Sequence, residues 1–445
     1  MICLMPSPVL RERTPDAAPP VTSVELFFDL VYVFAVTQLS QQLLHDLTLR
    51  GALETLVLFL AVWWAWNYTA WATNWIDPER PAVRVLMLVL MLISLVMSAK
   101  IPRAFEDEAV GFALAYVAIQ VVRSGFMVYA LRGRQMAQNY AQLLAWSCLA
   151  GAVWIAGAFL EGGARLLTWI AALALDYGAP LHGFALPRVG RTPTRAWTLA
   201  GGHLAERNRL VVLIALGETI LALGKTFSEL DASVSVVTAF VAGFVGIVSL
   251  WWVYFVRYAE EAALAISRSV DPTRMARAGY AYAHAIMVSG VIVVAVAIER
   301  TMAEPGGDMS VATAAVILGG PALYLAGNAL FNFALTEQAP SSRLVGIVLL
   351  AALVPLAAVV EPLALSIAET LVILALALAT GTPGFRPTRH GHHAPMREDE
   401  QQLAEEARRS REETEELREE AEQEDEVGDH STQTSSGGAD NVADD

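Results

Sequence analysis

The residues best suited to chemistry lie in one apolar stretch, His203–Gly224, which reads HLAERNRLVVLIALGETILALG. A helix turns 100° per residue, so His203, Arg207 and Glu218 share one face, with Glu218 about 16 Å beyond Arg207 along the axis. An ionised carboxylate facing lipid costs a few kcal/mol. We therefore expect Glu218 to face a polar interior, and His203 and Arg207 to lie at the helix mouth, where water reaches them.

A second acidic pair opens the first apolar stretch, VELFFDLVYVFAVTQLSQQL. Glu25 and Asp29 are four residues apart, so they share a helical face, with Tyr32 about one turn further on. Two neighbouring carboxylates need a cation or a proton close by. For Glu25 an alternative is a place in the headgroup region, where the positive end of the helix dipole favours an acid.

Arg123, in YVAIQVVRSGFMVYAL, is the basic residue that the sequence places well inside a span. Its guanidinium does not lose its proton readily, so it needs an acid partner or a path to water. Alternating helices would bring Arg123, Asp29 and Glu218 to similar depths. We therefore expect Asp29 or Glu218 to neutralise Arg123 within one cluster. Other polar residues expected at this depth are Asp176, His284, Asn328 and Asn332.

Such a cluster is compatible with three classes of function. In a secondary carrier, Glu218 or Asp29 takes up a proton or pairs with a solute, and His284 relays the proton, because histidine titrates near neutral pH. In a structural or scaffold membrane protein, the same groups form a closed network that fixes helix packing without transport. The third class is a membrane-embedded enzyme.

The motifs give little support to the enzyme class. The sequence has no Gly-rich phosphate loop, nucleophile elbow or HExxH, and HLAER places its acid wrongly for that zinc motif. His390, His392 and His393 lie in a Gly/Pro/Arg-rich stretch that is more typical of a linker than of a metal site. We therefore expect no cofactor, metal site or catalytic residue.

Composition predicts the fold class, an all-α polytopic membrane bundle. Of 445 residues, 55% are hydrophobic, and the mean hydropathy is +0.46, too apolar for a soluble protein of this length. Apolar runs long enough to cross about 30 Å of hydrocarbon recur along the chain. The lipid bilayer is thus the expected partner, with an unknown small solute or proton and no nucleic acid. The twelve predicted helices are 24–44, 52–71, 84–101, 109–131, 141–159, 164–181, 209–226, 234–256, 280–298, 311–335, 343–360 and 363–381.

Charge and cysteine content divide the chain further. The formal charge of −15 comes entirely from residues 398–445, which hold 19 acidic residues against 4 arginines. We expect a disordered leader at 1–20, a transmembrane domain at 21–382, and an acidic, largely disordered cytoplasmic tail at 383–445. Cys3 and Cys148 cannot build a disulfide framework.

Basic residues in the short loops predict the orientation. Outside the tail, the side that shares the N-terminus holds 16 lysines and arginines, including those of the 182–209 loop, and the opposite side holds 6. By the positive-inside rule, the first side faces the cytoplasm. An even number of helices then places both termini there.

An internal repeat is also visible, relating about 21–181 to about 203–381. Trp63-Trp64 in the second helix corresponds to Trp251-Trp252 in the eighth, MVYAL at the end of helix four to FNFAL at the end of helix ten, and Lys100 to Glu299. Six helices per half is an even number, so the two copies would be parallel, as in many carriers. Tryptophan pairs are alternatively common as interfacial aromatics.

Three separated motifs carry a family resemblance. VELFFDLVYVFAVTQLS, HLAERNRLVVLIALGETI and AHAIMVSGVIVVAVAIE resemble the bacterial low temperature requirement protein A family, over roughly residues 21–381. The resemblance implies a multi-pass inner-membrane protein linked by name to growth in the cold, and implies no reaction or solute. The matching positions are Glu25, Phe27, Phe28, Asp29, His203, Glu206, Arg207, Gly217, Glu218, His284 and Glu299.

Overall fold

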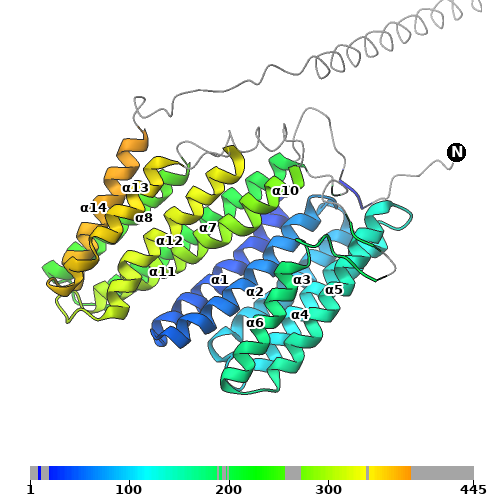
Figure 1. Cartoon of the computed structure of the whole chain (residues 1–445), viewed down its shortest axis with the longest axis horizontal. Coiled ribbons are helices and arrows are strands. Elements are labelled where there is room, and N and C mark those ends of the chain that lie inside the picture. The colour runs from blue at the N-terminus through cyan, green and yellow to red at the C-terminus, as the bar shows by residue number, and fades with distance from the viewer. Residues whose placement is uncertain are drawn as a thin grey trace, which may run out of the picture. The chain divides into compact units, whose positions relative to one another are not determined.

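The fold is a bundle of long helices (Figure 1). The computed structural model describes residues 9–11, 20–187, 190–192, 197, 200–255, 272–336 and 340–381, so the predicted tail and most of the leader lie outside the described residues. The first six helices are α1 Ser23–His45, α2 Leu49–Thr73, α3 Pro81–Ala99, α4 Ala109–Ala130, α5 Gln135–Ala158 and α6 Gly162–Gly178. The others are α7 Gly201–Glu229, α8 Val234–Phe255, α10 Pro272–Ala276, α11 His284–Ala303, α12 Val311–Thr336, α13 Ser341–Ala352 and α14 Pro362–Gly381.

Eleven helical segments among the described residues are long and apolar enough to cross a bilayer. The predicted span 164–181 appears as α6, which has 17 residues and is not among the eleven. At 1.5 Å per residue it reaches about 26 Å, somewhat less than the hydrocarbon thickness. The all-α polytopic class is therefore confirmed with eleven candidate spans, and the count of twelve stays a prediction.

The ninth predicted helix is not one regular helix. Between α10 and α11, residues Arg277–Ala283 form a π-helical segment, η3. Such segments are rare and often mark functional sites, because they shift the register of one turn. The indole Nε1 of Trp63 donates to the carbonyl oxygen of Ala281 at 2.7 Å, so α2 binds the backbone of this segment directly.

Two groups of helices meet along a central seam. In Figure 1, α1–α6 lie on one side, and α7, α8 and α11–α14 lie on the other. Helices α1 and α2 contact both α7 and α11, so these four helices form the seam. The α1–α7 contacts run from Glu25 with His203 to Thr37 with Glu218, so the two helices are parallel.

Helices α11 and α12 pack backbone to backbone. A Cβ added at Gly290 would lie 2.5 Å from the backbone nitrogen of Tyr324, and one at Gly320 would lie 2.8 Å from that of Val294. Gly327 is as crowded, with the backbone nitrogen of Met287 2.6 Å from such a Cβ. Small residues allow this close approach in membrane bundles, where packing replaces the hydrophobic drive between helices.

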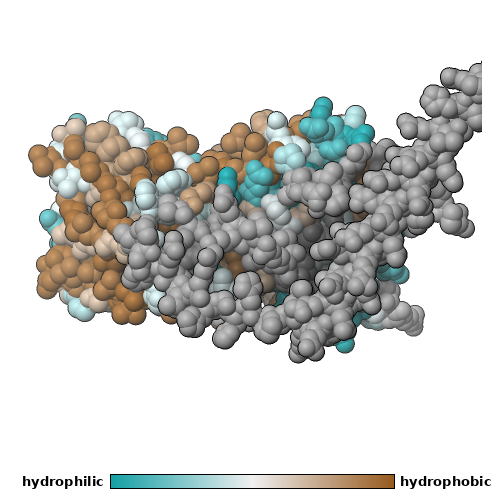
Figure 2. All heavy atoms as spheres, turned by 90° about the horizontal axis from the view of Figure 1, so that it is seen from above, coloured by the Kyte–Doolittle hydropathy of each residue, from teal (hydrophilic) through white to brown (hydrophobic). Residues whose placement is uncertain are grey.

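The outer surface is apolar, as a lipid-facing surface should be. Figure 2 shows hydrophobic side chains gathered at the end of the molecule where α8, α13 and α14 lie in Figure 1. Exposed residues on these helices include Val241, Phe244, Val345, Val348, Leu371 and Leu378. The apolar surface matches the bilayer expected from composition.

Candidate functional site

The acids of α1 are bound by a buried arginine of α7. The Arg207 guanidinium donates from Nη1 to Glu25 Oε1 at 3.1 Å and from Nη2 to Asp29 Oδ1 at 2.6 Å. Trp66 Nε1 also donates to Asp29 Oδ1, at 2.8 Å. Glu25, Asp29, His203 and Arg207 are fully buried, which contradicts the expectation that His203 and Arg207 lie where water reaches them. Because α7 begins at Gly201 rather than 209, Arg207 is held inside the bundle and is not a loop residue.

The other oxygen of Glu25 is bound by the start of the chain. Arg11 Nη2 donates to Glu25 Oε2 at 3.1 Å, and the backbone N–H of Thr22 donates to the same atom at 2.9 Å. Thr22 also caps α1 by accepting from the backbone N–H of Glu25. Arg11 is itself fixed, since its backbone N–H donates to the carbonyl oxygen of Trp75 at 3.0 Å.

His203 completes this network as a neutral side chain. Its Nε2 lies 2.9 Å from Glu25 Oε1, and its Nδ1 lies 3.3 Å from the amide nitrogen of Asn74. The amide N–H₂ is a donor, so Nδ1 accepts, and Nε2 carries the hydrogen that is donated to Glu25. The charges of Glu25, Asp29, Arg11 and Arg207 then balance. We call these four residues together with His203 the clamp.

A second polar group lies further along the same seam and contains no basic partner. Thr37 Oγ1 lies 2.5 Å from Glu218 Oε1, and Gln41 Nε2 lies 3.0 Å and 3.1 Å from the two carboxylate oxygens of Glu299. Thr37 and Gln41 are one turn apart on α1, so the two acids, from α7 and α11, line the same stretch of that helix. Among the described residues neither acid forms a salt bridge. We call Thr37, Gln41, Glu218 and Glu299 the acid pair site.

Arg123 does not bind either acid predicted for it. Its Nη2 donates to Gln120 Oε1, its Nη1 lies 3.4 Å from the carbonyl oxygen of Ala65, and its guanidinium lies 5.1 Å from the centre of the Tyr68 ring. The prediction of a pair with Asp29 or Glu218 was therefore wrong. Arg123 and Asp29 meet neighbouring residues of α2, Ala65 and Trp66, which lie between them. Glu218 instead contacts Thr37, about two turns beyond Asp29 on α1, so it does not share their level.

A chain of neutral groups connects Arg123 to a different acid. Gln120 Nε2 donates to Tyr116 OH at 2.9 Å, and that hydroxyl donates to Asp176 Oδ2 at 2.7 Å. Trp154 Nε1 donates to the same carboxylate oxygen at 3.1 Å. Hydrogen bonds through Gln120 and Tyr116 thus connect Arg123 to Asp176 on α6.

His284 also lies apart from the acids. It is buried between Tyr254 OH, 2.9 Å from Nε2, and the carbonyl oxygen of Gly279, 2.8 Å from Nδ1. Its ring packs edge-on against Phe331. Aromatic and backbone groups thus hold His284, so it is not a member of either acidic group. The expected single cluster is separated into the clamp, the acid pair site, the Arg123 chain and this histidine.

The comparison with protein families shows which family the chain belongs to. The family model described as "Bacterial low temperature requirement A protein (LtrA)" matches residues 20–378. The chain belongs to the LtrA family. It is 36% identical over 357 residues to the uncharacterized protein RA0937 of Rhizobium meliloti (strain 1021), covering 80% of this chain and 87% of that protein. No solved structure matches.

Within this LtrA chain, the residues of the three motifs lie in different groups of the structure. Glu25, Asp29, His203 and Arg207 meet in the clamp, and Glu218 and Glu299 belong to the acid pair site. Glu206 is exposed on α7, and its side chain joins neither group. Two motifs far apart in sequence therefore bind each other, and the third supplies one acid.

Sequence reasoning missed several buried ionisable residues of this LtrA chain, among them Arg343 and Glu369. Arg343, the first residue of the predicted helix 343–360, is fully buried, with Nε 2.9 Å from Asn328 Oδ1 and Nη2 3.0 Å from the carbonyl oxygen of Val253. Glu369, in α14, is 8% exposed and accepts from Thr370 Oγ1 at 3.3 Å. An acid in the middle of an apolar run was a sufficient signal for Glu369.

Proposed function

We propose that this LtrA family member is a secondary carrier in which Glu218 takes up and releases a proton. A buried carboxylate inside a membrane bundle is costly and is typically retained for transport or proton relay. The clamp is charge-balanced, so its acids are held as ions by arginine. Glu218 has only neutral hydrogen-bond partners among the described residues, which leaves it free to change its charge.

The observation that supports this role is the geometry around Thr37. Its single hydroxyl hydrogen has two acceptors in reach, the carbonyl oxygen of Val33 at 3.1 Å and Glu218 Oε1 at 2.5 Å. A protonated Glu218 donates to Thr37 Oγ1, which then donates to Val33. An ionised Glu218 instead accepts the hydroxyl hydrogen. Both protonation states are therefore hydrogen-bonded without any movement of the backbone.

The position of Glu218 at the seam fits a carrier. The acid pair site draws residues from α1, α7 and α11, so a change in the charge of Glu218 acts where the two groups of helices meet. Carriers commonly bind the coupling ion near the bilayer midplane, between two repeats. Glu299, half-buried and bound by Gln41, is the second acid of this site that would bind the proton or a solute.

We also propose the twelve-helix arrangement in two parallel repeats. Its support is that neighbouring pairs recur: α1 contacts α2 and α3 as α7 contacts α8 and α11, and α2 contacts α6 as α8 contacts α14. The parallel α1 and α7 are the first helices of the proposed halves. Trp63 and Trp64 are buried whereas Trp251 and Trp252 are partly exposed, so the matched tryptophans differ in environment.

Proton movement in proteoliposomes tests the carrier function. Liposomes containing the full chain and a trapped pH dye are given a membrane potential and mixtures of amino acids, sugars and organic acids. We expect solute-dependent proton movement with the wild type, and at least about tenfold less with Glu218→Gln, because the amide cannot ionise. Glu206→Gln, an exposed acid on the same helix, is the matched control and should behave as wild type.

A carbodiimide that modifies protonated carboxyl groups gives a readout that needs no solute. It should label Glu218 and spare Glu25, which the clamp holds as an ion. Wild-type proton movement in Glu218→Gln, or no movement with any mixture, would contradict the carrier. The second candidate, a structural membrane protein without flux, would then remain, and the closed clamp is the feature that favours it.

Both termini are proposed to be cytoplasmic. Arg207 and Arg343 are buried, so they no longer count among the loop residues on the side of the N-terminus. The remaining lysines and arginines on that side still outnumber those on the opposite side. In a chain with Cys3 and Cys148 replaced by serine, we expect Arg191→Cys to react with an impermeant maleimide only from the cytoplasm, and Ser233→Cys only from outside. Labelling of Arg191→Cys from outside would reverse the orientation.

A further inference from the structure

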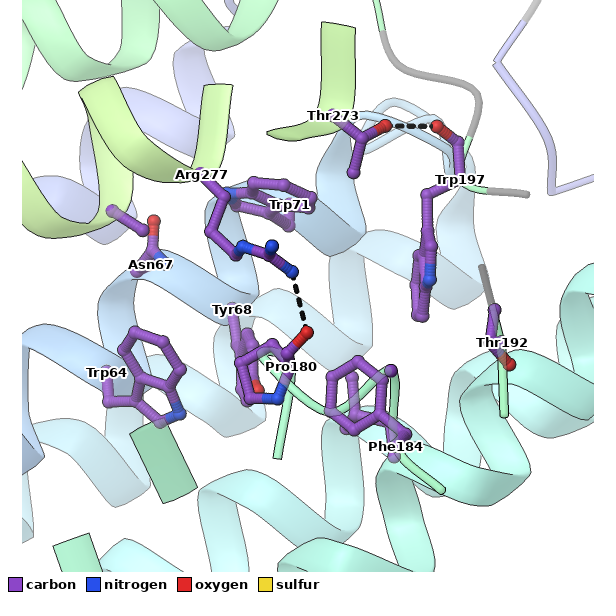
Figure 3. A pocket seen from close by; sticks show the side chains of 13 residues that line it. Trp64, Asn67, Tyr68, Trp71, Pro180, Phe184, Thr192, Trp197, Thr273 and Arg277 are labelled. Atoms are coloured by element: carbon purple, nitrogen blue, oxygen red, sulfur yellow. Dashed lines mark hydrogen bonds between the residues drawn. The ribbon is translucent and has the colours of Figure 1, made fainter. Parts of the chain in front are cut away.

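An aromatic pocket lies apart from both acidic groups. It is a partly open cavity of about 40 Å³ between the second half of α2, the loop after α6 and the π-helical segment η3 (Figure 3). Its walls include the rings of Trp64, Tyr68, Trp71, Phe184 and Trp197. A mostly apolar lining with a few polar groups is the usual form of a small-molecule site.

Two polar atoms of the walls have no partner among the described residues. Asn67 is 1% exposed, and its Oδ1 accepts no hydrogen bond. The indole nitrogen of Trp71 is also buried and donates to no described atom. Buried polar atoms are nearly always satisfied, so an acceptor and a donor left open in one pocket point to a ligand that offers both kinds of group.

Arg277 gives the pocket a positive charge. Its Nη1 donates to the carbonyl oxygen of Pro180 at 2.6 Å, an interaction that Figure 3 marks. No ion pair to Arg277 is formed by the described residues, and no acid is among the lining side chains. A guanidinium keeps several N–H donors in a planar fork that matches a carboxylate. The pocket therefore favours an anion and disfavours a cation.

The backbone of two walls is unusual. Phe184 has a φ of 51°, a left-handed conformation that is rare for a residue with a side chain, and Gly183 before it has a φ of 63°. A Cβ at position 183 would lie 2.6 Å from the carbonyl oxygen of Thr192. The opposite wall is the π-helical segment that carries Arg277. Strained and irregular backbone is concentrated at ligand sites, because the surroundings must hold it in place.

We propose that this pocket binds a small aromatic carboxylic acid that carries a ring hydroxyl or a similar donor. The flat ring packs between the aromatic walls, the carboxylate pairs with Arg277, and the hydroxyl donates to Asn67 Oδ1. The proposal goes beyond the carrier function and concerns binding alone. Binding of the acid without flux would support the binding proposal and contradict the carrier. Flux without binding at this pocket would contradict the binding proposal and support the carrier.

Calorimetric titration of the full chain in detergent tests the ligand class. The probes are benzoate and the hydroxybenzoate isomers, with acetate, benzyl alcohol and benzylamine as comparators that lack the ring, the anion or the right charge. We expect saturable binding of benzoate, tighter binding of at least one hydroxybenzoate, and affinities at least about tenfold weaker for the comparators.

Three variants assign the groups. Arg277→Gln should weaken benzoate binding by at least about tenfold, because a charge-assisted pair is lost. Asn67→Leu should abolish the preference for the hydroxybenzoate while keeping benzoate binding. Arg132→Gln, an exposed arginine after α4, is the matched control and should bind as wild type. Thermal melts of each variant show that the comparison is made on folded protein.

Several results would overturn the proposal. Acetate binding as tightly as benzoate would indicate a plain anion site. Benzyl alcohol binding as tightly as benzoate would show that the pocket does not recognise a carboxylate. Unchanged benzoate affinity in a folded Arg277→Gln variant would place the ligand elsewhere. Absence of saturable binding to the wild type would also refute it.

Discussion

Arg207→Met should destabilise the bundle by about 3–5 kcal/mol, the largest effect that we expect from any single charge removal. Methionine fills much of the arginine volume but leaves Glu25 and Asp29 buried with one cation fewer. Removing one partner of a buried pair is costly because the remaining charge has lost its solvent as well as its partner. Thermal melts in detergent and the fraction of monodisperse protein measure the loss.

Two comparisons make this result specific to the clamp. Arg209→Met lies two residues further along α7 on an exposed position and should leave the melting temperature close to wild type. Asp29→Asn combined with Arg207→Met removes one charge of each sign, leaves Glu25 paired with Arg11, and should recover part of the stability. A folded Arg207→Met variant that melts as Arg209→Met does would show that the clamp contributes nothing to stability.

Gly327→Ala should destabilise the protein by about 3 kcal/mol, although it adds one methyl group. That methyl group would lie 2.6 Å from the backbone nitrogen of Met287 and 2.8 Å from the carbonyl oxygen of Ala283. Backbone atoms cannot rotate away as a side chain can, so α11 and α12 must separate. Melting temperature and protease resistance in detergent measure the effect.

The same helix offers a matched control for this substitution. A Cβ at Gly319 meets no atom within 4 Å, so Gly319→Ala should be neutral or stabilising by up to about 1 kcal/mol. Equal melting of the two variants would show that α11 and α12 do not pack as closely as described. Because both changes add the same group to α12, differences in helix propensity cancel.

The helices were predictable from sequence because apolar runs of bilayer length leave few alternatives. Their ends were less predictable. Arg207 was read as lying at a helix mouth because a charged residue near the edge of an apolar run usually meets water. Arg207 is buried because it binds Glu25 and Asp29, which lie about 180 residues earlier in the chain. The residue pattern within one helix carries no information on such a contact.

The candidate site shows the same limit more clearly. Level along the helices was readable in part: Arg123 and Asp29 meet neighbouring residues of α2, whereas Glu218 meets α1 about two turns beyond Asp29. Lateral position was not readable, because it depends on how each helix is rotated about its axis. The Trp66 indole, which no sequence motif singled out, binds Asp29 and helps to separate it from Arg123. The Thr37–Glu218 contact likewise joins residues 181 positions apart.

The clamp has a consequence for the order in which the chain is built. Arg207 leaves the ribosome 178 residues after Asp29, a delay of about 9 to 36 s at 5–20 residues per second. During that interval α1 already sits among its neighbours with a carboxylate whose arginine has not yet been made. Synthesis therefore passes through a stage in which the first six helices hold an unneutralised acid at the future seam. Arrival of α7 ends that stage, so a ribosome stalled before α7 should leave a nascent chain prone to degradation.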